Sequence, residues 1–232
     1  MRTFLIRAIY CLLGIVCFAD GRVAVAQAPY QATGIKIGEL TETSAIVWTR
    51  LTRNAQRNGP DAPMVKIVVE KKGSSSNPNK KKVLAVEYPA GMGVGDIRDA
   101  APGAAGEVRV GYRADGTDAW TWADWKPVDE NRDFTRQFNF LYLHPDTEYS
   151  VKVESRTPQG GPAGQAVEGR FRTAPPADKP ARVAFTVSTG QGYGSQDHEG
   201  GYRIYLEMLK LKPSFFVHTG DIVYYDKLAK TE

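Results

Sequence analysis

The sequence predicts an all-β sandwich followed by a β-α-β unit, the incomplete start of an α/β domain. From residue 33 to 173, short runs of alternating polar and apolar residues are separated by polar turns, and no helical period is convincing. Two later runs rich in β-branched and aromatic residues, 182–188 and 213–219, flank a segment with helical spacing. A proline-rich connector at 174–180 separates the two patterns, so we place a domain boundary at about residue 178.

Residues 1–26 have the composition of a secretory signal peptide. Two arginines precede an apolar run at 8–19, and Ala24-Val-Ala26 offers a cleavage motif. About a dozen apolar residues are too few to span a bilayer comfortably, so we expect cleavage and no transmembrane segment afterwards. The mature protein is then secreted, periplasmic or on the cell surface. Both cysteines, Cys11 and Cys17, lie in this segment, so the mature chain has no disulfide and no thiolate ligand.

The formal net charge of +4 does not by itself indicate a nucleic-acid partner. Lysines at 71–72 and 80–82 flank a Gly, Ser and Asn-rich stretch, which is typical of a solvated hairpin tip. Basic residues that bind single-stranded nucleic acid are typically interleaved with aromatic residues, and this stretch has none. We therefore expect no nucleic-acid module.

The predicted sandwich, residues 29–178, begins with two strands on either side of a polar turn. These runs and the later strand candidates are 34–37, 45–51, 64–70, 134–143 and 148–155. Residues 90–106, rich in Gly and Ala, are expected to be a long flexible insertion.

Three tryptophans, Trp120, Trp122 and Trp125, alternate imperfectly through another predicted strand. They could form a carbohydrate-stacking platform, but aromatic residues in a sandwich more often pack in it or against it. We favour packing.

A turn motif near the end of the predicted sandwich is informative. Leu143, Pro145, Thr147 and Tyr149 form a Leu-x-Pro-x-Thr-x-Tyr pattern that resembles the fibronectin type III sandwich. In that fold a tyrosine at the start of a late strand bonds back to the backbone. We expect Tyr149 to do this.

The β-α-β pattern defines the candidate site. Tyr202, Tyr205, Leu206 and Leu209 recur at helical spacing, and Pro213 ends the helix. Two strands joined by one helix run parallel, so the loops beyond their carboxyl ends share a crevice. The loop 189–200 and the segment 221–224 should therefore face each other.

The order of these pieces resembles the PhoD-like alkaline phosphatases. The resemblance rests on Trp48-Thr-Arg-Leu51, on the hairpin 142–173 ending Phe-Arg-Thr-Ala-Pro, and on residues 183–224 with His218-Thr-Gly-Asp221. It covers the mature chain and implies a fibronectin type III-like sandwich followed by a calcineurin-like α/β metallophosphoesterase domain, here 179–232. Such enzymes hydrolyse phosphate mono- and diesters with metal ions, by resemblance iron and calcium.

Asp221 and Tyr224 are the expected metal ligands. A carboxylate at the end of a buried strand, after a glycine that lets the chain turn, can bridge two cations. The resemblance implies that the Tyr224 phenolate binds ferric iron. His218 matches a histidine of the family; a partly buried structural histidine is the more common role, and at most we expect it to hold the metal ligands in place without binding the metal. Gly190 stands where the family has a cysteine ligand. Asp197 and His198 are possible substitutes, although polar residues in such loops are more often solvated.

The family's further metal ligands lie in segments beyond the equivalent of Glu232. We therefore expect this chain to be the N-terminal fragment, or a truncated product, of a secreted metal-dependent phosphatase or phosphodiesterase, inactive by itself. The alternative is an extracellular β-sandwich binding or adhesion module with a vestigial phosphatase segment. A weaker third possibility is an inactive phosphatase-like domain that binds phosphate.

Overall fold

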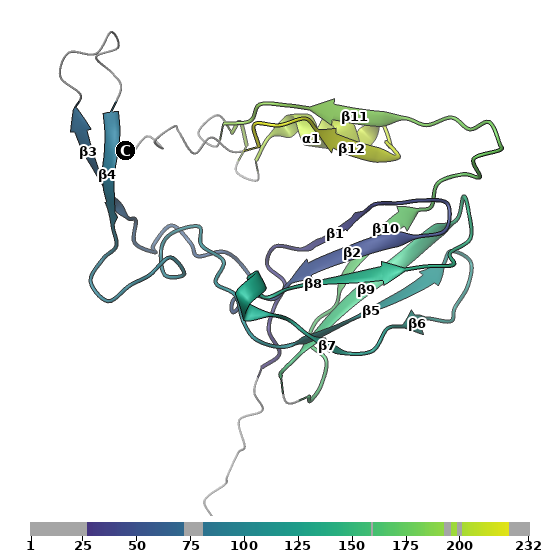
Figure 1. The fold of residues 1–232 in the computed structure, drawn as a ribbon, viewed down its shortest axis with the longest axis horizontal. Coiled ribbons are helices and arrows are strands. Elements are labelled where there is room, and N and C mark those ends of the chain that lie inside the picture. Colours follow the sequence, from purple (N-terminus) through teal and green to yellow (C-terminus); the bar gives the residue numbers. More distant parts are fainter. Residues whose placement is uncertain (1–26, 72–80, 159, 193–195, 199–200, 223–232) are drawn as a thin grey trace, which may run out of the picture.

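The computed structural model describes residues 27–71, 81–158, 160–192, 196–198 and 201–222. The chain is mostly β-structure with one α-helix, arranged as a β-sandwich, a hairpin inserted into it, and a β-α-β unit (Figure 1). Within the described part of the chain, no helix is both long enough and apolar enough to cross a membrane.

The first sheet of the sandwich has three antiparallel strands in the order β1-β2-β8. They are β1 (Ile35–Gly38), β2 (Ala45–Arg50) and β8 (Thr135–Phe140). In β2 every second residue is buried, beginning with Ala45 and Val47. This alternation places one face of the strand in the core.

The second sheet has the order β10-β9-β5-β6, and β7 also pairs with β5. Its strands are β5 (Glu107–Ala114), β6 (Thr121–Trp122), β7 (Lys126–Pro127), β9 (Glu148–Arg156) and β10 (Val167–Arg172). A short 3-10 helix, η1 (Glu130–Arg132), precedes β8. The region of the three tryptophans, predicted as one strand, forms only the two-residue strands β6 and β7. β5 is a central strand that we did not predict.

The inner faces of the two sheets enclose one apolar core. Its buried members are Ala45, Val47, Leu51, Val108, Val110, Phe138, Phe140, Leu143, Tyr149, Val151, Val153 and Phe171. Burying each Val, Leu or Phe side chain of this core stabilises the fold by about 1.5–3 kcal/mol. The predicted sandwich is confirmed at this level.

Tyr149 forms the expected corner at the start of β9. Its hydroxyl oxygen accepts the backbone N–H of His144 at 2.8 Å. Its ring stacks on Phe171, with the centroids 5.3 Å apart. The predicted role of Tyr149 is confirmed.

A long insertion connects β2 to β5. It contains the hairpin β3 (Lys66–Lys71) and β4 (Lys81–Glu87), which stands away from the sandwich (Figure 1). The insertion begins and ends at one place, because Thr52 bridges Gly103 and the N–H of Ala104 donates to Leu51 O at 3.2 Å.

Residues 90–106 contain no helix or strand, as expected, but hydrogen bonds tie them down. The Asn58 side-chain amide donates to the carbonyls of Gly95 and Ile97, both at 2.9 Å. Arg50 Nη1 donates to Ala101 O at 2.7 Å. The expectation of a flexible insertion did not allow for these anchors, because they come from residues far away in the sequence.

The β-α-β unit consists of β11 (Phe185–Ser188), α1 (Arg203–Lys210) and β12 (Phe215–His218). The two strands are parallel, as predicted, and Phe185 pairs with Phe215. Their rings stack on one face at 5.1 Å. On the other face, Tyr205 of α1 meets the ring of Phe216 edge-on at 5.6 Å.

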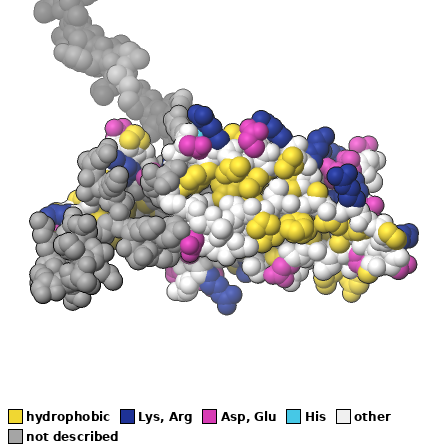
Figure 2. All heavy atoms as spheres, turned by 90° about the horizontal axis from the view of Figure 1, so that it is seen from above, with side chains coloured by type: hydrophobic (Ala, Val, Ile, Leu, Met, Phe, Trp, Pro, Cys, Tyr) yellow, Lys and Arg dark blue, Asp and Glu magenta, His cyan; other side chains and the backbone are white. Residues whose placement is uncertain are grey.

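Much of the apolar surface of this unit is exposed. Figure 2 looks down on this side of the molecule and shows hydrophobic side chains gathered there. The exposed ones in the unit are Val183, Phe185, Val187, Ile204, Leu206, Leu209, Leu211, Phe215 and Phe216. A two-stranded sheet with one helix is too small to bury its own apolar faces.

Candidate functional site

The loops that follow β11 and β12 lie side by side. The backbone N–H groups of Gly190 and Gln191 donate to the carbonyls of Gly220 and Asp221, at 3.2 and 3.0 Å. The N–H of Thr219 donates in return to Ser188 O at 2.9 Å. The prediction that these two segments face each other is confirmed for their described residues.

The chain turns sharply as it leaves β12. Gly220 has φ 128° and Asp221 has φ 56°, while Gly190 across from them has φ 63°. The left-handed region costs a residue with a side chain roughly 1–2 kcal/mol, although Asp tolerates it better than most. Strained residues of this kind cluster at functional sites. This turn holds Asp221 directly beyond the end of β12, where the residue is exposed to solvent.

Asp197 is engaged at the start of α1. Its Oδ1 accepts the backbone N–H of Arg203, the first helical residue, at 2.9 Å. A carboxylate there satisfies a free N–H and complements the helix dipole. Asp197 thus has a structural role, and its role as a substitute metal ligand stays a prediction.

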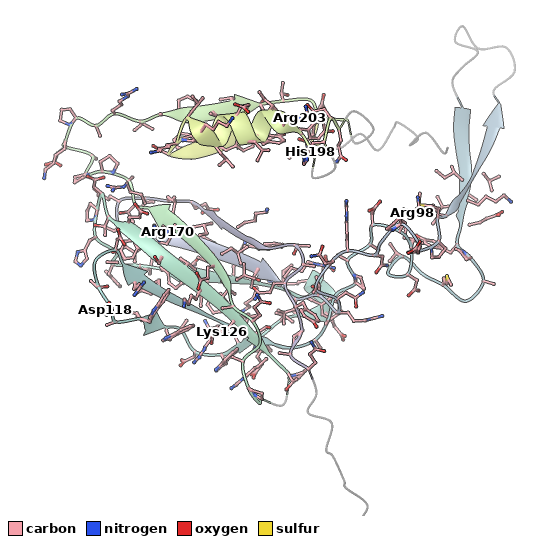
Figure 3. The ribbon with its side chains drawn as sticks, turned by 180° about the vertical axis from the view of Figure 1, so that it is seen from behind. Arg98, Asp118, Lys126, Arg170, His198 and Arg203 are labelled. Atoms are coloured by element: carbon pink, nitrogen blue, oxygen red, sulfur yellow. The ribbon has the colours of Figure 1, made fainter. Side chains whose placement is uncertain are left out.

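His198 forms a two-hydrogen-bond bridge with Gly201, at 3.1 and 2.9 Å through the backbone. Figure 3 labels His198 and Arg203 at the same end of the β-α-β unit. The loop after β11 therefore brings His198 to the end of the unit where α1 begins. Its use as a ligand is likewise a prediction.

His218 is the last residue of β12. Its Nδ1 accepts the backbone N–H of Gly220 at 3.3 Å. Nε2 is buried and has no hydrogen-bond partner among the described residues. His218 shares the helix-covered face with Phe216, its neighbour two positions before. That His218 helps to hold metal ligands in place remains a prediction.

The described residues do not form a complete metal site. Among them, no three His, Cys, Asp or Glu side chains lie close enough to hold a metal ion. Gly190 offers no side chain, and Tyr224 lies outside the described residues. The oxygen of Asp221 suits a hard cation, but one carboxylate is not a ligand set.

The three tryptophans line the outer face of the second sheet and pack against cations. Arg109 lies over Trp122 and Trp125, at 4.3 and 4.7 Å from the ring centroids. Trp120 has Lys152 at 4.9 Å and Arg113 at 5.0 Å over its ring. The packing interpretation of the tryptophans is confirmed.

No family model and no curated protein matches the sequence. Among solved structures, the structure of PhoD matches 86% of this chain with 17% identity and a TM-score of 0.52. The chain has a PhoD-like fold. It spans only 29% of the PhoD chain, and at this identity the likeness to PhoD concerns the fold alone.

Single fibronectin type III domains also match. The fn3 domain of human collagen alpha-1(XX) chain has 13% identity and a TM-score of 0.29, covering 72% of this chain and 98% of its own. The fn3 domain of human contactin 1 has the same identity and TM-score, with coverages of 75% and 100%. Likenesses of this size carry no argument.

Proposed function

We propose that this chain supplies the N-terminal sandwich and the first β-α-β unit of a secreted, metal-dependent phosphoesterase related to PhoD. The sandwich would be residues 29–178, and the metallophosphoesterase domain would begin at 179. The observation that carries the proposal is Asp221, held in a left-handed turn directly beyond β12 and beside the loop that follows β11. Ligands of open α/β sheets bind at such strand ends.

In this proposal Asp221 and Tyr224 supply hard oxygen ligands for iron and calcium, and the substrate is a phosphate mono- or diester. His218 would orient the turn that carries Asp221, through its hydrogen bond with the Gly220 N–H. Because the described residues do not complete a ligand set, we propose no catalytic step for this chain alone. We expect it to be inactive without further ligands.

The inactivity is tested with the purified chain and bis(p-nitrophenyl) phosphate, with ferric and calcium ions added together. We expect no hydrolysis beyond that of the metal ions without protein. Hydrolysis that disappears in Asp221→Asn but persists in Asp197→Asn would overturn this expectation, since it would mean that this chain holds a working site.

The proposal itself is tested on the gene. The nucleotide sequence downstream of the codon for Glu232 should continue in some frame with Asn-His or Asp-His and His-x-His motifs, the missing metal ligands. A stop codon followed by unrelated sequence in all three frames would contradict it, and would leave the sandwich as the functional part.

A further inference from the structure

The outer face of the second sheet is hollowed at one end. The hollow has a volume of about 320 Å³, at the lower end of the usual range for ligand pockets. Figure 3 labels Arg170, one of its lining residues, on β10. The lining side chains used below are Arg113, Trp120, Ser150, Lys152, Glu168 and Arg170.

The strand register creates this hollow. Ser150 of β9 lies directly between Arg113 of β5 and Arg170 of β10 in the sheet. Side chains paired across neighbouring strands point to the same face. A short hydroxyl side chain between two long guanidinium side chains leaves a depression with Ser150 at its floor.

The charges of the hollow are unbalanced. Lys152 pairs with Glu168 at 3.2 Å, and the largely exposed Arg170 reaches Glu148 only at 3.5 Å. Within the part of the chain that the structure describes, Arg113 has no carboxylate within 4 Å. By contrast, Arg109 and Arg156 on the same face each have a carboxylate oxygen at 2.7 Å. Among the side chains that line the hollow, three are cations (Arg113, Lys152 and Arg170) and one is a carboxylate (Glu168).

Trp120 holds these cations instead of offering a free stacking surface. Arg113 and Lys152 both lie over its ring, and Trp122 approaches at 5.9 Å. Stacking of a nucleobase requires an open aromatic face. The arrangement instead fixes two cations at the rim of the hollow, which lowers the entropy lost when they bind a ligand.

We propose that this hollow binds an acidic saccharide, a sugar ring that carries a carboxylate or a sulfate. Arg113 and Arg170 match the anionic group, because guanidinium groups bind oxyanions through paired N–H donors. Glu168 and the Ser150 hydroxyl can accept hydrogen bonds from the sugar hydroxyls. A simple anion would leave the acceptor oxygens of Glu168 and Ser150 unused, and a neutral sugar would leave Arg113 and Arg170 without an anionic partner. This inference does not depend on the phosphoesterase proposal.

Calorimetric titration of the whole chain with trigalacturonate tests the inference, with maltotriose as the neutral control. We expect trigalacturonate to bind and maltotriose not to. Arg113→Gln and Arg170→Gln should each weaken binding about tenfold or more, the effect of losing one charge-assisted hydrogen bond. Arg172→Gln, an exposed arginine on the same strand that pairs with Asp146 outside the hollow, should change affinity less than about twofold.

Glu168→Ala separates a built site from general attraction to positive charge. The variant is more positive, so diffuse attraction predicts tighter binding, whereas loss of a hydrogen-bond acceptor for sugar hydroxyls predicts weaker binding. We expect weaker binding. Three results would each overturn the proposal. The first is that neither trigalacturonate nor sulfated dextran oligomers bind, and the second is an equal loss of affinity in Arg172→Gln and Arg113→Gln. The third is tighter binding of oligo-dT than of either saccharide. Arg170 is mostly exposed, so its variant gives a result even if Arg113→Gln does not fold.

Discussion

Replacing Tyr149 by Phe removes a single oxygen atom from the corner of the sandwich where β9 begins. That oxygen accepts the backbone N–H of His144 at 2.8 Å. The ring stacks on Phe171 and meets Tyr112 edge-on, contacts that a phenylalanine keeps. Any change in the free energy of unfolding therefore reports the hydrogen bond alone.

The magnitude follows from the burial of the two partners. The Tyr149 side chain is 3% exposed, so water does not easily replace its oxygen, while the N–H of His144 is only partly buried. A hydrogen bond contributes roughly 1 kcal/mol, and an unsatisfied buried donor costs about 1–3 kcal/mol. We expect a loss of about 1–2 kcal/mol. With a urea slope of about 1.5 kcal/mol/M, this lowers the unfolding midpoint by roughly 1 M.

Urea unfolding followed by tryptophan fluorescence measures this change, because all four tryptophans belong to the sandwich region. The matched control is Tyr142→Phe, whose side chain is 93% exposed and should leave the midpoint unchanged. Equal midpoints for the Tyr149→Phe and Tyr142→Phe proteins, at the same slope, would refute the reasoning.

Two further substitutions probe the packing of the sandwich. Gly103→Ala would place a Cβ 1.9 Å from the Phe134 ring, so we expect its melting temperature to be lower by about 5–10 °C. In the control Gly38→Ala the new Cβ meets open space, and the melting temperature should be unchanged. Arg109→Lys keeps the charge beside Glu154 but loses the planar stacking on two tryptophan rings, and should cost about 1 kcal/mol in urea unfolding. An unchanged near-ultraviolet circular dichroism spectrum in that variant would show that the stacking does not order the rings.

The parts of the fold that local sequence determines could be predicted. The alternation in β2 and the turn motif that ends in Tyr149 are local signals, and both predictions are confirmed. β5 was missed although Glu107–Ala114 alternates just as clearly. It follows a long Gly- and Ala-rich insertion, and its long partner β9 is about forty residues further along the chain. The partners that follow it closely, β6 and β7, have only two residues each, so they give no clear hairpin pattern.

The candidate site also has a part that the sequence predicted and a part that it did not. The rule for parallel strands was enough to bring the loops after β11 and β12 together. Gly220 indicated that the chain turns there, but the left-handed φ of Asp221 itself depends on how those loops bond and was not predicted. The hollow between Arg113, Ser150 and Arg170 was also missed, because it depends on the register of three strands. The charges at alternate positions of these strands were its only sequence signal.

The two ends of the β2-β5 insertion meet, so this long segment connects the two strands in the same way as a short turn would. The pairing of Thr52 with Gly103 and the bond from Ala104 to Leu51 form a neck that is closed whatever lies beyond it. Doubling the length of such a loop costs only about 0.6 kcal/mol in closure entropy. The chain can thus gain or lose whole hairpins within this insertion while the two sheets keep their alignment. The insertion is a position where new structure can be added without changing the sandwich.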